Sequence, residues 1–284
     1  MKLTPNWNGR IIFDIEKQDN FRYKNRESKE FKRGYQIEIQ QNDVNKFEVY
    51  YPNSILNQIK LFNDYEDYIK TDATSVTKTI FYEVDENYAF EDIINKNEII
   101  NSIKKDGDTL VKQIHDEEHQ EDFSYTINLI CESENRFDKY ILDDIIKVHF
   151  NYGLKIESGY YFNLGKTSIS KKVLKKIFAK SKYVLHKEHF MRHEVTDDFI
   201  IVEFLKISET SSSNNKANWE QIEDDFACGE FYPNECKNLT FTHEIFVYDL
   251  DDQILNSYCK TQVIDTKDMR KEIIHKINNI NTYN

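Results

Sequence analysis

Apolar and polar residues alternate in three segments near the start of the chain, and this alternation predicts half-buried antiparallel strands. The segments are residues 10–16, 35–40 and 46–51. The charged link at 17–34 is expected to form a long loop, and Pro52 ends the third strand. Ser54 then caps residues 54–70, where apolar side chains recur every three or four positions and predict a helix.

Further elements are expected before residue 133. A strand is predicted at 76–84, and a helix at 91–105 with acidic residues in its first turn. Gly107 suits the position that follows the end of a helix. Residues 109–114 and 123–131 are predicted to be the two strands of a hairpin, because polarity alternates along the second of them.

The second half of the chain alternates between helical and extended patterns. Helices are predicted at 136–150, at 168–190, where the helix is basic and amphipathic, and at 266–280. A continuous apolar run predicts a buried strand at 198–207. Two long strands are expected on either side of the acidic turn at 249–252.

Together these elements predict an α+β fold of mainly antiparallel strands with about five helices, arranged as two strand–helix modules. The modules are assigned to residues 1–132 and 133–284. Residues 208–218 are rich in Ser and Asn and are expected to form a flexible loop within the second module.

Composition narrows the classes of function. The formal net charge of −12 disfavours broad nucleic-acid binding, because such binding needs clustered Lys and Arg. The 7 glycines are not clustered, so a dinucleotide-binding fold is not expected, and we predict no bound cofactor. No apolar segment has the length of a membrane span, and residues 1–10 lack the apolar core of a signal peptide. A cytoplasmic protein without membrane contact is therefore predicted.

The stretch QIHDEEHQED at 113–122 contains the spacing H-x-x-E-H, formed by His115, Glu118 and His119. This spacing resembles the motif of the inverted zinc peptidases. Such a zinc site needs both histidines on one helical face. Apolar alternation stops before the acidic run and resumes after it, so we predict an exposed hairpin loop instead of a catalytic zinc site.

A second group of histidines is the first place to look for a metal. His186, His189 and His193 fall at i, i+3 and i+7, so a helix that continued through them would align all three. The alternative is a helix end with solvated histidines, which suit the helix dipole. We favour this alternative and predict no metal.

Three other patterns in the sequence could form ligand sites. Gly165, Lys166 and Thr167 resemble the end of a phosphate-binding P-loop, but the bulky residues before them favour a helix cap after a surface turn. The acidic turn at 249–252 could bind a divalent ion, although hairpin turns also favour Asp for backbone reasons. In a reducing compartment the cysteines are expected to be free thiols. A zinc site would have to combine Cys228, Cys236, His243 and Cys259, which include no C-x-x-C pair.

Aromatic and basic residues indicate contact surfaces. The chain has 18 Tyr and 19 Phe, and tyrosine anchors many protein interfaces. The lysines of 171–182 surround an apolar stripe and can meet an acidic surface. The interaction residues expected from these patterns are Tyr50, Tyr51, Tyr160, Tyr161, Lys171, Lys172, Lys175 and Lys176.

The leading prediction is a non-enzymatic factor that binds another protein or protein complex and forms a homo-oligomer. Abundant Asn, Lys and Ile indicate an AT-rich genome, and a phage or mobile element is a typical source of a chain without familiar motifs. The predicted role is inhibition of a host antiviral enzyme complex in the host cytoplasm. One alternative is a metal-dependent hydrolase that uses His186, His189 and His193. Another is a nucleic-acid-binding module that uses the lysines of 171–182.

Overall fold

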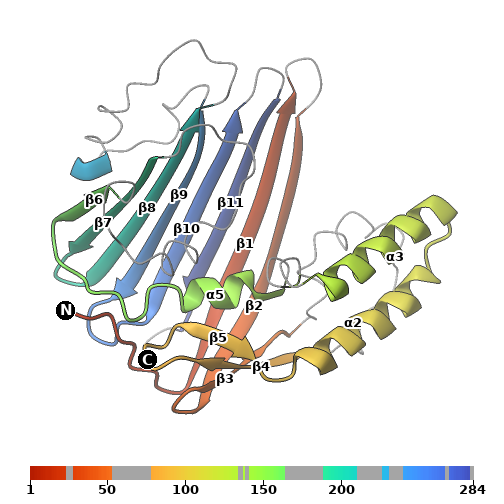
Figure 1. Cartoon of the computed structure of the whole chain (residues 1–284), viewed down its shortest axis with the longest axis horizontal. Helices are drawn as coiled ribbons and strands as arrows, with labels where there is room; N and C mark the ends of the chain where they lie inside the picture. Colours follow the sequence, from red (N-terminus) through yellow and green to blue (C-terminus); the bar gives the residue numbers. More distant parts are fainter. Residues whose placement is uncertain are drawn as a thin grey trace. The chain divides into compact units, whose positions relative to one another are not determined.

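The computed structural model is shown in Figure 1. It describes residues 1–23, 28–52, 78–133, 137, 141–163, 188–209, 226–229, 239–265 and 269–281. Within them the strands form an 11-stranded sheet with the order β5-β4-β3-β2-β1-β11-β10-β9-β8-β7-β6. The strand pairs whose register is defined are antiparallel.

The strands and helices have the following bounds. In the first part of the chain they are β1 (Arg10–Tyr23), β2 (Lys29–Asp43), β3 (Lys46–Tyr50), β4 (Thr79–Val84), β5 (Phe90–Ile93), α2 (Lys96–Val111) and α3 (Glu117–Glu132). In the second part they are α5 (Asp143–Val148), β6 (Tyr160–Asn163), β7 (Glu188–Val195), β8 (Phe199–Glu209), β9 (Leu239–Asp249), β10 (Leu255–Asp265) and β11 (Met269–Asn279). Among the described residues, no helix is both long and apolar enough to cross a membrane.

The fold is dominated by β-sheet, so the prediction of an α+β fold with about five helices and two strand–helix modules was wrong. Two segments account for much of the error. The link at 17–34 was expected to be a loop, yet its described residues mostly continue β1 and β2. The helix predicted at 266–280 is instead strand β11.

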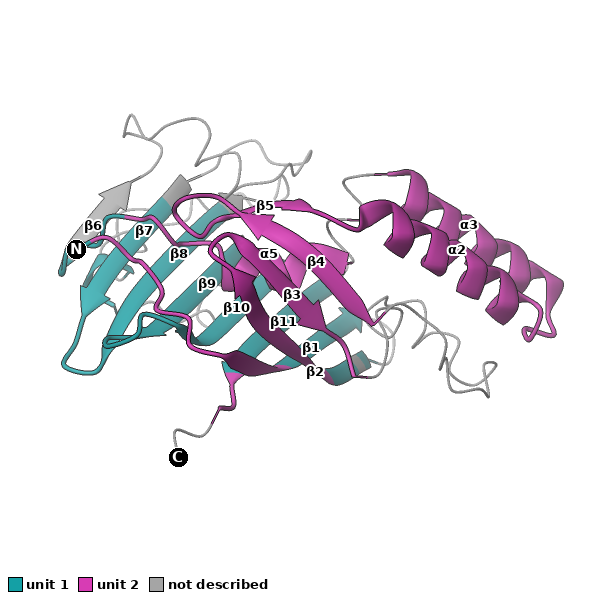
Figure 2. Cartoon of the chain, turned by 90° about the horizontal axis from the view of Figure 1, so that it is seen from below, with its two compact units in different colours: residues 1, 15–34, 155–278 teal, residues 2–14, 35–154, 279–284 magenta. Residues whose placement is uncertain are grey.

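The chain divides into two compact units, coloured separately in Figure 2. Unit 1 comprises residues 1, 15–34 and 155–278, and unit 2 comprises residues 2–14, 35–154 and 279–284. Both units therefore combine segments from distant parts of the sequence. The division into 1–132 and 133–284 stays a prediction, because it concerns which segments fold independently. Of the predicted loop at 208–218, residues 210–218 lie outside the described part, as does the helix predicted at 54–70.

Unit 1 contains the antiparallel series from β11 to β6, which Figure 1 shows side by side. The strands predicted at 198–207 and on both sides of the turn at 249–252 are confirmed as β8, β9 and β10. Most of their buried side chains are large and apolar. The rings of Phe246 and Tyr258 lie 4.7 Å apart between centroids, and both side chains are buried. Aromatic pairs of this kind contribute stabilisation beyond their buried area.

Unit 2 contains β3, β4, β5, the helices α2, α3 and α5, the beginning of β1 and the end of β2, while the other parts of β1 and β2 belong to unit 1. The strands β3 and β4 confirm the predictions at 46–51 and 76–84. Helices α2 and α3 lie side by side in both views. The hairpin of strands predicted at 109–114 and 123–131 was therefore wrong: these residues belong mostly to the end of α2 and to α3.

The period of burial explains the error in α3. Phe123, Ile127 and Ile130 are buried at i, i+4 and i+7, whereas Tyr125 is 66% exposed. A strand would have placed Phe123, Tyr125 and Ile127 on the same face. Asp116 caps the helix, because its side chain accepts a hydrogen bond from the backbone N–H of His119 at 3.0 Å.

Candidate functional site

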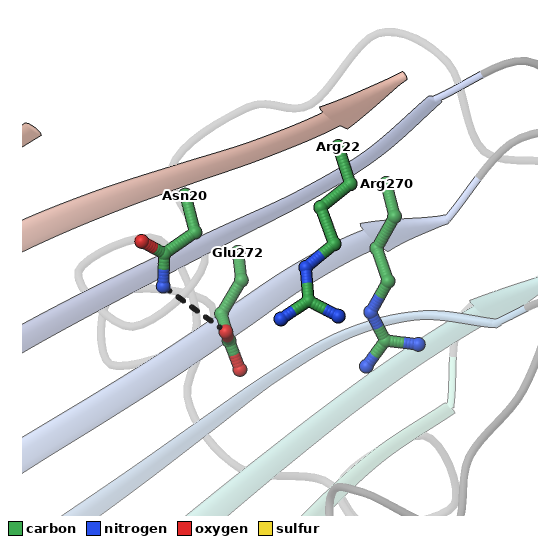
Figure 3. Close-up of a pocket in the computed structure, with 4 residues that line it drawn as sticks. All are labelled: Asn20, Arg22, Arg270 and Glu272. Carbon is green, nitrogen blue, oxygen red and sulfur yellow. Dashed lines mark hydrogen bonds between the residues drawn. The ribbon is translucent and has the colours of Figure 1, made fainter. Parts of the chain in front are cut away.

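A cleft of about 260 Å³ lies on unit 1, where β1 and β11 are neighbours in the sheet. Two residues of each strand line it, namely Asn20 and Arg22 from β1 and Arg270 and Glu272 from β11. Figure 3 shows these four side chains rising from the same face of the two strands. The two guanidinium groups lie next to each other, with Glu272 between Asn20 and the arginines.

The alternation of side chains along a strand explains this arrangement. Residues two positions apart point to the same face, so Asn20 and Arg22 form one pair, and Arg270 and Glu272 form the other. Asn20 lies beside Glu272, and Arg22 lies beside Arg270, as expected for strands that run in opposite directions. Two residues distant in sequence thereby place two permanent positive charges side by side.

Hydrogen bonds orient the side-chain amide of Asn20 in the cleft. Nδ2 of Asn20 donates to Oε2 of Glu272 at 3.3 Å. The amide of Asn20 is oriented in turn by Gln18, whose Nε2 donates to Oδ1 of Asn20 at 3.2 Å and to Oε1 of Glu30 at 2.9 Å. This chain holds the Glu272 carboxylate in the cleft from one side.

Two ion pairs involve charged residues near the cleft. On the same face of β1, Nζ of Lys32 lies 3.1 Å from Oε1 of Glu16. The hydrogen bond from Lys32, together with the charge of Lys276, holds the pKa of Glu16 below its usual value. On the opposite face, Nζ of Lys271 lies 3.6 Å from Oδ2 of Asp19. The same Lys271 nitrogen lies 4.5 Å from the centroid of the Phe21 ring.

The chemistry of the cleft is that of anion recognition. Guanidinium groups donate hydrogen bonds and accept none, and their planar shape matches a carboxylate or phosphate. Arg22 is exposed, while Arg270, Glu272 and Asn20 are half-buried, so the site is open to a ligand from solvent. The two guanidinium groups among its lining residues support the binding of an anion.

A second polar group lies on β7, β8 and β9 of unit 1, largely buried. Nη2 of Arg192 donates to Oε1 of Glu203 at 2.8 Å, and Nε2 of His243 lies 3.3 Å from Oε2 of the same carboxylate. Burial raises the pKa of Glu203, but hydrogen bonds from His243 and Arg192 outweigh burial and lower it overall. At Gly229, φ is +77° and a Cβ would lie 2.5 Å from Nη1 of Arg192, so glycine permits this close approach.

The structure corrects the prediction for the second histidine group. His193 and the backbone of His189 lie on strand β7, so the helical alignment of His186, His189 and His193 is wrong over these two residues. His193 is 1% exposed, and burial lowers its pKa to about 4 against the opposing effect of Glu157. His186 lies outside the described residues.

The predicted interaction residues fall in different settings. Tyr50 is half-buried on β3, and Tyr51 is 1% exposed in unit 2. Tyr160 and Tyr161 lie on β6, but their side chains are outside the described part of the structure. Lys171, Lys172, Lys175 and Lys176 are outside it as well, as is the segment Gly165–Thr167. None of these residues lines the cleft of Arg22 and Arg270.

The H-x-x-E-H stretch spans the beginning of α3. Glu118 and His119 lie in its first turn, and His115 precedes the capping Asp116, so the predicted hairpin loop was wrong. Nδ1 of His119 lies 2.9 Å from Oδ1 of Asp116. His115 and Glu118 are exposed, as the sequence predicted.

The structure describes some residues of the two remaining metal candidates, the acidic turn at 249–252 and the cysteine group. Oδ1 of Asp249 accepts backbone hydrogen bonds from Asp251 at 2.8 Å and Asp252 at 3.3 Å, which supports the backbone explanation of this acidic turn. Cys228 is an exposed free thiol, and Cys259 is a half-buried one on β10. Cys236 lies outside the described residues.

Comparisons with known proteins do not assign a family. No family model matches the chain, and no curated protein matches it. A structure of lipovitellin has a TM-score of 0.44 and 10% identity, and covers 98% of this chain but only 25% of its own. Ail, the attachment invasion locus protein of Yersinia pestis, has a TM-score of 0.19 and 4% identity, over 96% of this chain and 99% of its own. With TM-scores below 0.5, neither likeness defines this chain's fold or function.

Proposed function

We propose that this chain is a non-enzymatic protein-binding factor whose Arg22–Arg270 cleft holds a carboxylate of its partner. The supporting observation is the pair of guanidinium groups side by side in a cleft that also contains Glu272 and Asn20. Arginine is enriched at protein interfaces because its planar fork binds carboxylates through two parallel hydrogen bonds.

A protein partner fits this cleft better than a nucleic acid does. Nucleic-acid binders neutralise several phosphates, and roughly 6–10 such contacts are common in duplex complexes. The cleft offers two arginines, and Glu272 would face any phosphate backbone that entered. A protein segment, by contrast, carries both carboxylates for the arginines and N–H groups for Glu272.

The overall negative charge of the chain is compatible with an acidic ligand at this position. The net charge of −12 is spread over 284 residues, and physiological salt screens charges beyond about 8 Å. Within that distance the local charges decide, and the cleft contributes two positive charges against one negative. The narrower predictions of a host antiviral enzyme as the target, and of a homo-oligomer, stay predictions from the sequence.

The proposal is tested with an acetylated, amidated tetraglutamate peptide titrated into the full chain, followed by calorimetry or amide chemical shifts. Replacing both arginines (R22Q and R270Q) should weaken binding at least tenfold, because both bidentate partners are lost. The matched control replaces two exposed lysines of α2 (K104Q and K105Q), which removes the same charge elsewhere.

The control should change affinity less than twofold, and a tetraglutamine peptide should not bind. The proposal fails if the wild-type chain does not bind tetraglutamate. It also fails if the lysine variant loses as much affinity as the arginine variant, since the attraction would then come from charge alone. Melting curves of both variants establish that each is folded.

A further inference from the structure

Glu272 is an unusual component of an anion-binding cleft. Its carboxylate lies beside Asn20 and next to the two arginines, so it places a fixed negative charge where an anionic ligand would enter. It is half-buried and accepts a hydrogen bond from Asn20, whose amide is in turn oriented by Gln18. Its position therefore affects which anions the arginines can hold.

We infer that Glu272 makes the cleft selective for singly charged carboxylates that carry a neighbouring N–H group, and that it disfavours phosphate. This inference rests on the proposed function, because it assumes that Arg22 and Arg270 bind the anion. It adds the chemical class of the ligand and assigns the selectivity to one residue.

Charge is the first reason. Glu272 adds one negative charge to the lining of the cleft. A carboxylate brings one further negative charge next to Glu272, whereas a phosphate dianion brings two. Like charges held within a few ångströms repel even when solvent screens them in part.

Hydrogen-bonding capacity is the second reason. Ionised Glu272 accepts hydrogen bonds and donates none, and a phosphate dianion likewise has no proton to offer it. The glutamate or aspartate of a peptide differs, because backbone N–H groups lie within a few bonds of its carboxylate. Such a ligand can give its carboxylate to the arginines and an N–H to Glu272 at the same time.

A purely supporting role for Glu272 makes the opposite prediction. If the carboxylate only held Asn20 and the arginines in position, its loss would weaken the binding of every anion. If it selects among anions, its loss should improve the binding of phosphate while leaving that of a peptide carboxylate equal or weaker. The sign of the change for phosphate therefore separates the two roles.

The experiment compares wild-type chain with E272Q by amide chemical-shift titration at about pH 8, where inorganic phosphate is mainly a dianion. The probes are inorganic phosphate and the tripeptide acetyl-Gly-Glu-Gly-amide. We expect E272Q to bind phosphate about fivefold more tightly than wild type and the tripeptide equally or up to threefold more weakly. The control is E117Q, which removes one negative charge from an exposed position of α3 outside the cleft.

Unchanged or weaker phosphate binding by E272Q would overturn the inference, as would an equal gain in E117Q. The arginine variants distinguish a failure of this inference from a failure of the proposed function. If R22Q and R270Q abolish tripeptide binding while E272Q leaves the preference unaltered, only the selectivity role fails. If the arginine variants bind the tripeptide normally, the proposed function fails first.

Discussion

The phenolic hydroxyl of Tyr82 lies 2.9 Å from Nε2 of His149 in the core of unit 2. On the other side of the ring, Nδ1 of His149 lies 2.9 Å from the carbonyl oxygen of Tyr88. A carbonyl oxygen only accepts, so Nδ1 carries the proton and Nε2 accepts the hydrogen bond that Tyr82 donates. Burial, opposed by the bond to Tyr88, lowers the pKa of His149 to about 4 and keeps the ring neutral.

Acid should therefore destabilise unit 2 through His149. Its pKa is about 6.5 in the unfolded chain and about 4 in the folded one, so below about pH 6.5 the unfolded state binds more protons. The free energy of unfolding should fall as pH decreases from about 6.5 to about 4, by roughly 3 kcal/mol in total from this residue. Above pH 7 this contribution should be constant.

Urea unfolding at about pH 7.5 and pH 5 measures this effect. His149→Phe should be less stable than wild type at pH 7.5, but the difference should shrink by about 2 kcal/mol at pH 5, because the variant has no ring to protonate. Replacing the exposed His115 by Gln should leave the pH dependence unaltered. A constant difference between wild type and His149→Phe would refute the assignment of a buried neutral ring.

The hydroxyl of Tyr82 should itself contribute measurably to stability. Tyr82→Phe leaves Nε2 of His149 buried without its donor, which should lower the free energy of unfolding by about 1–3 kcal/mol. Tyr125→Phe is the matched control on α3, where 66% exposure lets water replace the lost hydroxyl contacts. Its effect should stay within about 0.5 kcal/mol. Equal losses in the two variants would contradict the buried hydrogen bond.

The contact between α2 and α3 depends on the absence of a side chain at Gly107. A Cβ there would lie 2.8 Å from Cγ2 and 3.2 Å from Cγ1 of Ile127, which is buried and β-branched. Alanine has a higher helix propensity than glycine by about 1 kcal/mol, but this overlap should outweigh it. Gly107→Ala should therefore lower the free energy of unfolding by about 1–2 kcal/mol.

A double-mutant cycle with Ile127→Ala separates the steric overlap at Gly107 from the change in helix propensity. Ile127→Ala removes both γ carbons that a Cβ at position 107 would meet. In that background, Gly107→Ala should be neutral or stabilising. Comparing Asn101→Gly with Asn101→Ala, at an exposed position of α2, measures the difference in helix propensity between Gly and Ala alone. If Gly107→Ala costs the same in both backgrounds, close packing on Ile127 is not the reason for glycine at this position.

Local pattern predicted strands β8, β9 and β10 of unit 1 but failed where distant pairing decides the structure. The continuous apolar run of β8 predicts a buried strand from the sequence alone, because a run of this length and composition is typical of such strands. The Ile273, Ile274 and Ile277 spacing of β11 fits a helix face equally well. Its strand conformation comes from pairing with β10, as between Ile274 and Thr261, and such tertiary contacts override local propensity.

The cleft was missed for the same reason. Arg22 was assigned to a charged loop and Arg270 to a helix, and nothing local connects residues so distant in sequence. The polar residues of this region form cross-strand pairs, such as Lys32 with Glu16, which stabilise a strand without apolar alternation. The stretch from Gln18 to Arg22 contains one apolar residue, Phe21, so no alternation of apolar and polar residues marked it as a strand.

The buried ion pair of Arg192 and Glu203 should be worth more than an exposed one of the same kind. Nη2 of Arg192 donates to both Glu203 and Glu194 at 2.8 Å, and Glu203 is largely buried. Arg192→Met leaves the Glu203 carboxylate with less compensation and should lower the free energy of unfolding by about 2 kcal/mol. The loss should shrink in acid. Because the pKa of Glu203 is lower in the folded chain than in the unfolded chain, its ionised carboxylate stabilises the fold at neutral pH, and this stabilisation is lost as the pH falls below the unfolded pKa and through the folded one.

Arg10 and Glu38 provide the exposed comparison, with 2.7 Å between Nη1 and Oε2 and a 58% exposed arginine side chain. Arg10→Met should cost less than about 1 kcal/mol, because solvent already compensates both charges. Adding Glu203→Leu to Arg192→Met should recover part of the stability, since the uncompensated buried charge is then gone. If Arg192→Met costs no more than Arg10→Met, or if the double variant is the least stable, burial does not set the strength of this pair.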